Sequence, residues 1–187
     1  MKKTLLLGQI VFLSIGHIKA DNTEYSIKAD STAYSNEIQD TFFGVKFGTS
    51  KEEVKATLLS RGFEIVSDGL DAMLVEHDGN IRFGGYSWEY MLVQFVNNRF
   101  ESISFVITLD DRNSKLKLTT KDVSSIFTPI LSDLSKKYNM SIRDLKGTFT
   151  YRADSEQKFV ALSWFVEKKA IMLVYGDKTL GDNSDQF

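Results

Sequence analysis

The sequence contains no cysteine, one proline and two histidines among its 187 residues. The absence of cysteine excludes disulfides, thiolate metal sites, cysteine nucleophiles and a lipidated N-terminal cysteine. With 23 basic against 25 acidic side chains, the chain also lacks the basic excess with which proteins neutralise nucleic acid phosphates. We therefore expect no nucleic acid partner and no cofactor.

The composition, 42% hydrophobic and 26% charged, is typical of a folded soluble protein. Residues 1–20 have a different pattern, because Lys2 and Lys3 precede an apolar stretch over Thr4–Gly16, and Ala20 offers a small residue for cleavage. This stretch is shorter than the about 20 apolar residues that span a membrane. We predict a signal peptide, and an exported protein that is soluble in the periplasm or the extracellular space without a transmembrane anchor.

The rest of the chain divides into an arm, a domain and a tail. Residues 21–41 are mostly polar and predict a flexible N-terminal arm. Residues 42–176 carry the periodic apolar pattern of a single domain, and residues 177–187 predict a polar tail. A chain of about 165 residues is long enough to be stabilised by its hydrophobic core alone.

Two helices are predicted. Ser50-Lys51-Glu52-Glu53 has the form of a capping box, in which a serine hydroxyl and a glutamate carboxylate bind backbone amides at a helix start. This helix ends at Arg61-Gly62, where glycine permits a left-handed backbone. A second helix is predicted over Thr120–Tyr138, with Pro129 in its middle. The apolar positions keep their phase through the proline, so we expect one kinked helix.

Alternation of apolar and polar residues predicts four strands between Leu70 and Leu109. Asp78-Gly79 and Asn97-Asn98 fit tight hairpin turns, because both pairs tolerate positive φ. Three more strands follow the second helix, near Thr148–Arg152, Phe159–Val166 and Ala170–Tyr175. The order α-β4-α-β3 predicts a two-layer α+β fold, with helices packed on a mainly antiparallel sheet and a faint internal duplication.

The segment Phe47-Gly48-Thr49-Ser50-Lys51-Glu52-Glu53-Val54, followed by Leu58, resembles the repeat opening of small bacterial envelope proteins. In the outer-membrane lipoprotein SmpA/OmlA group and the similarly folded β-lactamase-inhibitor proteins, a glycine and a capping Ser/Thr precede a helix with Glu/Gln-Val and then Leu. This chain departs from them, because it has neither the lipidation cysteine nor a cysteine pair, and no clear second copy of the motif. The resemblance implies a helix-on-sheet protein that binds other envelope proteins, and it transfers no catalytic residue.

Candidate catalytic and metal-binding residues are few. His77 lies between Glu76 and Asp78, but neighbours on a strand point to opposite faces, and a zinc site needs three or four ligands. Asp110-Asp111-Arg112-Asn113 begins like a calcium loop and lacks its glycine and glutamate, which favours a solvated turn. Nucleophile, phosphate-loop and dinucleotide motifs are missing. We predict no metal site and no enzymatic activity. An active site made of two carboxylates that the fold brings together remains an open alternative.

Aromatic residues on the predicted sheet are the sequence feature that best indicates a binding site. Tyr86, Trp88 and Tyr90 share one strand face by their period of two, Phe83 is nearby, and Trp164 comes from a later strand. These five residues fit either core packing or an exposed patch for a protein or glycan surface. We predict a non-enzymatic binding protein that contacts a protein partner through them. The alternative is a carrier with a pocket for a small apolar ligand between helix and sheet.

Overall fold

The computed structural model describes residues 37–108, 123–145 and 148–181. The predicted signal peptide, most of the predicted arm and the segment Asp110–Asn113 lie outside these residues. Within the described part of the chain, no helix combines the length and the apolar character needed to cross a membrane.

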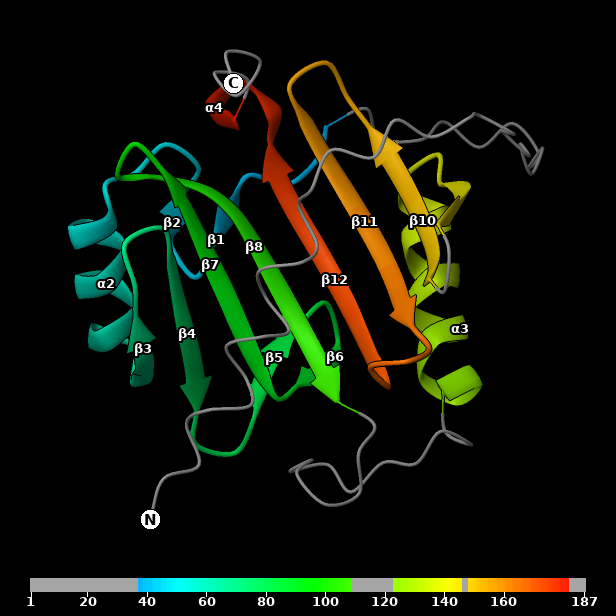
Figure 1. Ribbon diagram of the computed structural model, residues 1–187, viewed down its shortest axis with the longest axis horizontal. Coiled ribbons are helices and arrows are strands. Elements are labelled where there is room, and N and C mark those ends of the chain that lie inside the picture. The colour runs from blue at the N-terminus through cyan, green and yellow to red at the C-terminus, as the bar shows by residue number, and fades with distance from the viewer. Residues whose placement is uncertain (1–36, 109–122, 146–147, 182–187) are drawn as a thin grey trace.

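A single antiparallel sheet of eight strands forms the body of the protein (Figure 1). In space the order is β3-β4-β7-β8-β12-β11-β10-β9, so each half of the chain supplies four neighbouring strands and β8 meets β12 at the centre. The strands are β3 (Phe63–Asp68), β4 (Ala72–His77), β7 (Tyr90–Val96), β8 (Arg99–Thr108), β9 (Ser141–Leu145), β10 (Thr148–Asp154), β11 (Lys158–Phe165) and β12 (Ala170–Asp177).

Short elements surround this sheet. Two are small hairpins, β1 (Thr41–Phe42) with β2 (Val45–Lys46), and β5 (Ile81–Phe83) with β6 (Tyr86–Trp88). The described residues also form three helices, α2 (Lys51–Ser60), α3 (Val123–Lys137) and α4 (Lys178–Gly181). Figure 1 shows α2 beside β3 at one end of the sheet and α3 behind β10 at the other.

The two longer helices form where their local sequence predicts. Both hydrogen bonds of the capping box are present at the start of α2, between Ser50 and Glu53. Gly62 follows this helix with φ of +81°, a backbone that side chains rarely adopt. Helix α3 runs without interruption through Pro129, whose ring is exposed. A single helix through Pro129 is therefore confirmed, whereas its kink stays a prediction. The buried face of the helix consists of Val123, Phe127, Ile130 and Leu134.

The predicted two-layer α+β fold with the order α-β4-α-β3 is wrong. Strands hold 52% of the described residues and helices 23%, so the chain is mostly β. Eight strands span roughly 35 Å, whereas one helix covers about 10 Å, so two helices cannot make a second layer. They cover the ends of one sheet face, and the two hairpins pack between them through Phe42, Phe83 and Trp88.

Aromatic rings fill the centre of the core. Phe83 stacks on Phe105 of β8 with 4.1 Å between ring centroids, and Phe42 lies 5.1 Å from Tyr175 of β12. The opposite face of the sheet carries hydroxyl groups instead: Thr150 and Ser163, on neighbouring strands, are buried and share a hydrogen bond of 2.9 Å. The largest fully buried side chains among the described residues therefore gather on the face that the hairpins cover.

Turns and strand partners differ in how well the sequence predicts them. Asn97-Asn98 joins β7 to β8 with φ of 50° and 62°, as predicted. Asp78-Gly79 does not form a hairpin, because β4 pairs with β3 and β7 while β5 pairs with β6. Strands β3 and β9 were not predicted, because each follows a helix closely and carries charged residues on a sheet edge.

The domain begins before residue 42. Ile38 is 4% exposed and belongs to the hydrophobic core, and the carbonyl of Asp40 accepts a hydrogen bond of 2.9 Å from the Phe47 amide. The described end of the predicted arm is therefore packed against the sheet. At the other end of the chain, the first residues of the predicted tail form α4, whose Thr179 amide binds the Asp177 carboxylate at 2.9 Å.

Candidate functional site

The structure does not bring the five predicted binding residues together. Phe83, Tyr86 and Trp88 lie on the β5–β6 hairpin, while Tyr90 begins β7 and Trp164 lies on β11. Trp88 is fully buried, and its indole donates a hydrogen bond of 3.1 Å to the Phe83 carbonyl. Trp88 therefore belongs to the core and is not available to a partner.

Tyr86 and Tyr90 point in different directions. The Tyr86 hydroxyl donates a hydrogen bond of 2.6 Å to Asp133 of α3, and burial together with this carboxylate raises the pKa of Tyr86 to about 12. Tyr90 lies opposite Val106 on the sheet face turned away from the aromatic core, where burial raises its pKa. Tyr86 thus joins a hairpin to a helix, and Tyr90 packs on the other side of the sheet.

Trp164 stacks on an aromatic residue that sequence reasoning did not name. Phe149 of β10 lies directly opposite it, with ring centroids 5.4 Å apart and planes inclined by 26°. Phe149 is 48% exposed, and Val166, two residues beyond Trp164, is 43% exposed. We call Phe149, Trp164 and Val166 the aromatic surface. It lies at the end of β10 and β11 that is farther from their connecting turn.

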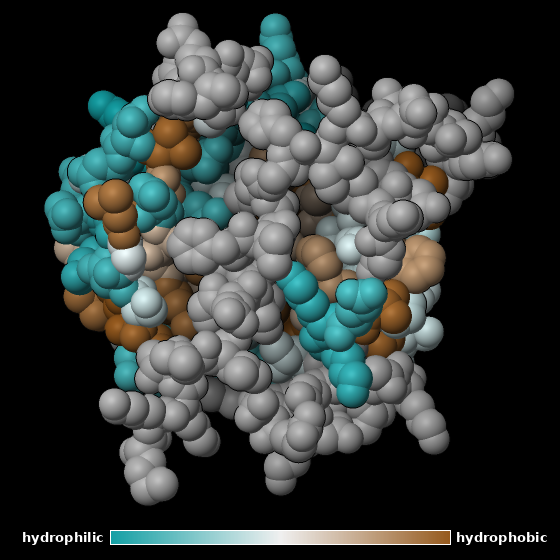
Figure 2. Space-filling model, viewed as in Figure 1, coloured by the Kyte–Doolittle hydropathy of each residue, from teal (hydrophilic) through white to brown (hydrophobic). Residues whose placement is uncertain are grey.

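Exposed apolar residues at the opposite end of the sheet are dispersed among charged ones. Leu59 of α2 is 49% exposed and Leu70, between β3 and β4, is 87% exposed. The ammonium groups of Lys51 and Lys55 on α2 lie 2.7 and 2.6 Å from the Asp68 carboxylate, and both lower the pKa of Asp68. Figure 2 shows hydrophobic spots separated by hydrophilic surface over this end of the molecule. No aromatic ring is among these exposed residues.

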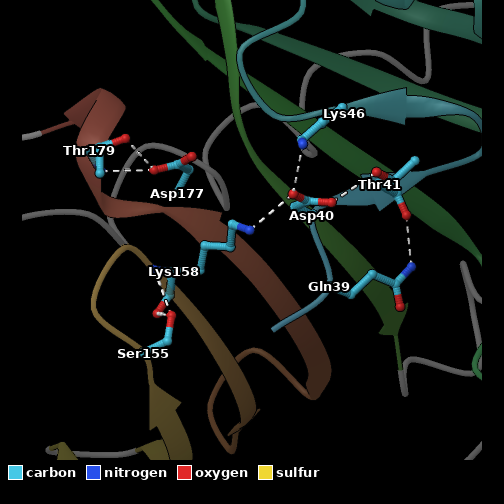
Figure 3. Close-up of polar contacts among 8 residues, drawn as sticks. All are labelled: Gln39, Asp40, Thr41, Lys46, Ser155, Lys158, Asp177 and Thr179. Carbon is cyan, nitrogen blue, oxygen red and sulfur yellow. Dashed lines mark hydrogen bonds and ion pairs between the residues drawn. The ribbon is translucent and has the colours of Figure 1, made fainter. Parts of the chain in front are cut away.

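A polar cluster fixes the N-terminal segment to the turn between β10 and β11 (Figure 3). The Asp40 carboxylate lies 3.0 Å from the Lys158 ammonium and 3.4 Å from that of Lys46, and it accepts a hydrogen bond of 2.9 Å from the Thr41 hydroxyl. The hydrogen bond from Lys158 is the main cause that lowers the pKa of Asp40. This contact joins residues 118 positions apart in the sequence.

A pocket of about 540 Å³ opens beside this cluster, and we call it the hairpin pocket. Its lining includes three buried residues, Ile38, Tyr138 and Ala153. The remaining lining residues are polar or charged: Glu37, Asp154, Ser155, Glu156, Gln157 and Lys158. This polar lining differs from the apolar pocket between helix and sheet that the carrier hypothesis predicts.

Hydrogen bonds hold the rim of the hairpin pocket in place. The Ser155 hydroxyl accepts from the Lys158 amide at 3.0 Å and donates to the Lys158 carbonyl at 3.2 Å. Arg152 binds Asp154 through two nitrogens at 2.8 and 2.7 Å, and the Lys178 ammonium lies 3.6 Å from the same carboxylate. Such a bidentate pair fixes geometry as well as charge, so the rim has a defined shape.

Other titratable groups do not form a recognisable catalytic arrangement in the described part of the chain. His77 Nδ1 lies 2.6 Å from the Asp78 carbonyl, and its ring packs on Phe63. Burial, and then the nearby Asp177, raise the pKa of Glu101, but neither carboxylate lines the hairpin pocket. No group of three metal-binding side chains is present among the described residues.

Two residues at these sites were missed by sequence reasoning. Phe149 could have been found from the turn, since pairing Asp154 with Phe159 across the hairpin places Phe149 opposite Trp164 by counting. Tyr138 lies at a helical position typical of a core residue, and no sequence signal distinguishes its hydroxyl. Comparison of the chain with family models, curated proteins and solved structures finds no match. The resemblance of the Phe47–Val54 segment to envelope proteins therefore stays a prediction.

Replacing Asp40 by asparagine is expected to lower the free energy of unfolding by about 1 kcal/mol at pH 7. Because the folded chain lowers the pKa of Asp40 below its ordinary 3.8, this stabilisation is present above that pH. It is lost as the pH falls through the folded value. Urea unfolding of both chains from pH 7 to about pH 2 should show their difference vanish toward acid. Asp71→Asn, at an exposed carboxylate, is the control, and an equal effect of both substitutions at pH 7 would contradict the assignment.

Proposed function

We propose that this chain is an exported, non-enzymatic binding protein that contacts a protein partner through the aromatic surface. The observation that carries the proposal is the Phe149–Trp164 pair, which is stacked on adjacent strands and leaves one ring 48% exposed. Aromatic residues are enriched in protein interfaces, and tryptophan is among the residues that most often carry their binding energy. Export is proposed from the basic and apolar residues of the N-terminus.

The aromatic surface suits a protein partner because its geometry is fixed in advance. The rings of Phe149 and Trp164, which are paired residues on adjacent strands, are already stacked in the free chain, so few side-chain rotamers are lost on binding. Lys168 and Lys169 lie in the turn that follows Val166, and the Lys168 ammonium lies 5.9 Å from the Phe165 ring centroid. A partner with an apolar anchor would match this surface.

Affinity capture from the exported fraction of the native cells tests whether a protein partner binds the aromatic surface. The bait is the chain from residue 21 onward, as wild type and as Phe149→Glu, which places a charge in the centre of the aromatic surface. The control is Leu59→Glu, because Leu59 is 49% exposed at the other end of the sheet. We expect one protein to bind wild type and the control, and binding to the Phe149 variant to fall at least about tenfold.

Each variant is first checked for folding by circular dichroism and thermal melting. Equal capture of the same proteins by the wild type and the Phe149 variant contradicts the proposed surface. Loss of capture in the Leu59 variant alone would move the interface to the α2 end of the sheet. Conversion of the captured protein or another added compound by the pure chain would contradict the non-enzymatic role.

A further inference from the structure

The two tryptophans differ in what their indole N–H groups bind. Trp88 lies in the core, and its indole donates a hydrogen bond of 3.1 Å to the Phe83 carbonyl. Trp164 is only partly buried, and its indole nitrogen is open to solvent and donates no hydrogen bond to a described residue. Tryptophan suits an interface because its ring is apolar while its N–H stays available to a partner. The aromatic surface therefore offers one free hydrogen-bond donor.

The side chains of the aromatic surface offer no acceptor beside this donor. Phe149 and Val166 have no polar side-chain atom, and an indole nitrogen only donates. An ordinary peptide that lies across these side chains brings backbone N–H groups, which lose water and find no acceptor on them. The carbonyl groups of the same peptide can accept from Trp164. The surface therefore favours a ligand that is rich in carbonyl groups and poor in N–H groups.

Proline-rich segments have this chemistry. Each proline lacks the backbone N–H and keeps the carbonyl. Such segments form the extended polyproline II helix, which makes no internal hydrogen bonds, so its carbonyl groups stay free. This helix is formed before binding, so little conformational entropy is lost, and several peptide-binding domains recognise it with aromatic side chains. The stacked rings of Phe149 and Trp164 provide a similar surface, because Phe149 is 48% exposed.

We propose that the aromatic surface binds a proline-rich segment of the partner protein in the polyproline II conformation. The Trp164 N–H donates to a carbonyl of this segment, and proline rings pack on Phe149 and Val166. The partial positive charge of the donor then meets the partial negative charge of the carbonyl oxygen, and such electrostatic complementarity gives an interface its specificity. The inference rests on the proposed function, because it specifies which part of the partner contacts the same surface.

Isothermal titration calorimetry of the chain from residue 21 onward tests this inference, with acetylated decaproline as the probe. The matched probes are a glycine–serine repeat and a leucine–glutamine repeat of the same length, which both carry backbone N–H groups. We expect decaproline to bind with a Kd between about 10 μM and 1 mM, and the other two to bind at least about tenfold more weakly. Equal binding of the leucine–glutamine repeat, or no binding of decaproline at about 10 mM, would overturn the inference.

The indole N–H of Trp164 is followed directly by nuclear magnetic resonance. Decaproline should move the indole signal of Trp164 and leave that of Trp88 in place, and Trp164→Phe identifies the first signal by its loss. Trp164→Phe keeps an aromatic ring and removes the donor, so it should weaken decaproline binding at least about threefold. Leu59→Glu is the control and should bind like the wild type. An unmoved Trp164 signal, or full affinity of the Trp164 variant, would contradict the assigned hydrogen bond.

The failure of this inference is distinguishable from the failure of the proposed function. Decaproline should compete with the captured partner for the wild-type chain, and Phe149→Glu should abolish the binding of both. A partner that Phe149→Glu loses but decaproline does not displace would support the proposed function and contradict the proline-rich segment. Binding of decaproline without capture of any protein would support the specificity of the surface and contradict the proposed partner.

Discussion

Replacing Trp88 by alanine is expected to lower the free energy of unfolding by about 3 to 5 kcal/mol, the usual effect of truncating a buried tryptophan. Trp88 is fully buried and its ring lies 5.8 Å from that of Phe105. It lies opposite Ile81 in the β5–β6 hairpin, and its indole donates a hydrogen bond to the Phe83 carbonyl. The substitution would leave a cavity beneath the hairpin and an unpaired carbonyl. Urea denaturation followed by circular dichroism measures the loss.

Trp164→Ala is the matched control for this prediction. Trp164 is only partly buried and its stacking partner Phe149 is 48% exposed, so truncation should cost about 1 to 2 kcal/mol. If the Trp88 variant fails to fold, Trp88→Phe should still fold with an intermediate loss. Equal losses for the two alanine variants would contradict the different roles assigned to the two tryptophans.

Local sequence signals predicted the local structure well. The capping box at Ser50, the turn at Asn97-Asn98 and the uninterrupted helix through Pro129 are all present. Each depends on residues within one or two turns of the chain, where backbone sterics and capping hydrogen bonds act directly. The alternation around Ile103 and Phe105 likewise placed the core face of β8 correctly.

The pairing of distant strands could not be read in the same way. Alternation shows that a segment is a strand, and it does not show which strand lies beside it. The turn at Asp78-Gly79 therefore suggested a hairpin. In the structure β4 pairs with β7, and the two short strands between them in the sequence, β5 and β6, pair with each other. Edge strand β3 escaped detection because Glu64 and Asp68, which protect a free edge, also weaken its apolar pattern.

The candidate sites show the same limit. Period-two spacing placed Tyr86, Trp88 and Tyr90 on one face, but β6 ends at Trp88 and β7 begins at Tyr90. The sequence could not separate the fully buried Trp88 from the partly buried Trp164, because both tryptophans have similar apolar neighbours on their strands. The hairpin pocket depends on residues 38, 138 and 153–158, which meet only after the N-terminal segment has packed on the sheet.

The N-terminal segment also covers the middle of the sheet, through the β1–β2 hairpin. The helices protect the ends of one face, so the centre of the core depends on two hairpins of very short strands. A two-stranded hairpin is barely stable by itself, and it must gain its stability from the side chains that it places against the sheet. Phe42 is the central side chain of the first hairpin, with four phenylalanine rings and one tyrosine ring around it.

Phe42→Ala is therefore expected to lower the free energy of unfolding by about 3 to 5 kcal/mol, although Phe42 directly follows the segment that was predicted to be a flexible arm. Phe42 is 2% exposed, and its ring contacts join β1 to β8 and β12. Phe149→Ala removes an equal side chain that is 48% exposed, and it should cost about 1 kcal/mol or less. Chemical unfolding of both variants measures the difference. Similar small losses for both would mean that residues 37–47 detach from the sheet, and the hairpin pocket would then lose one of its walls.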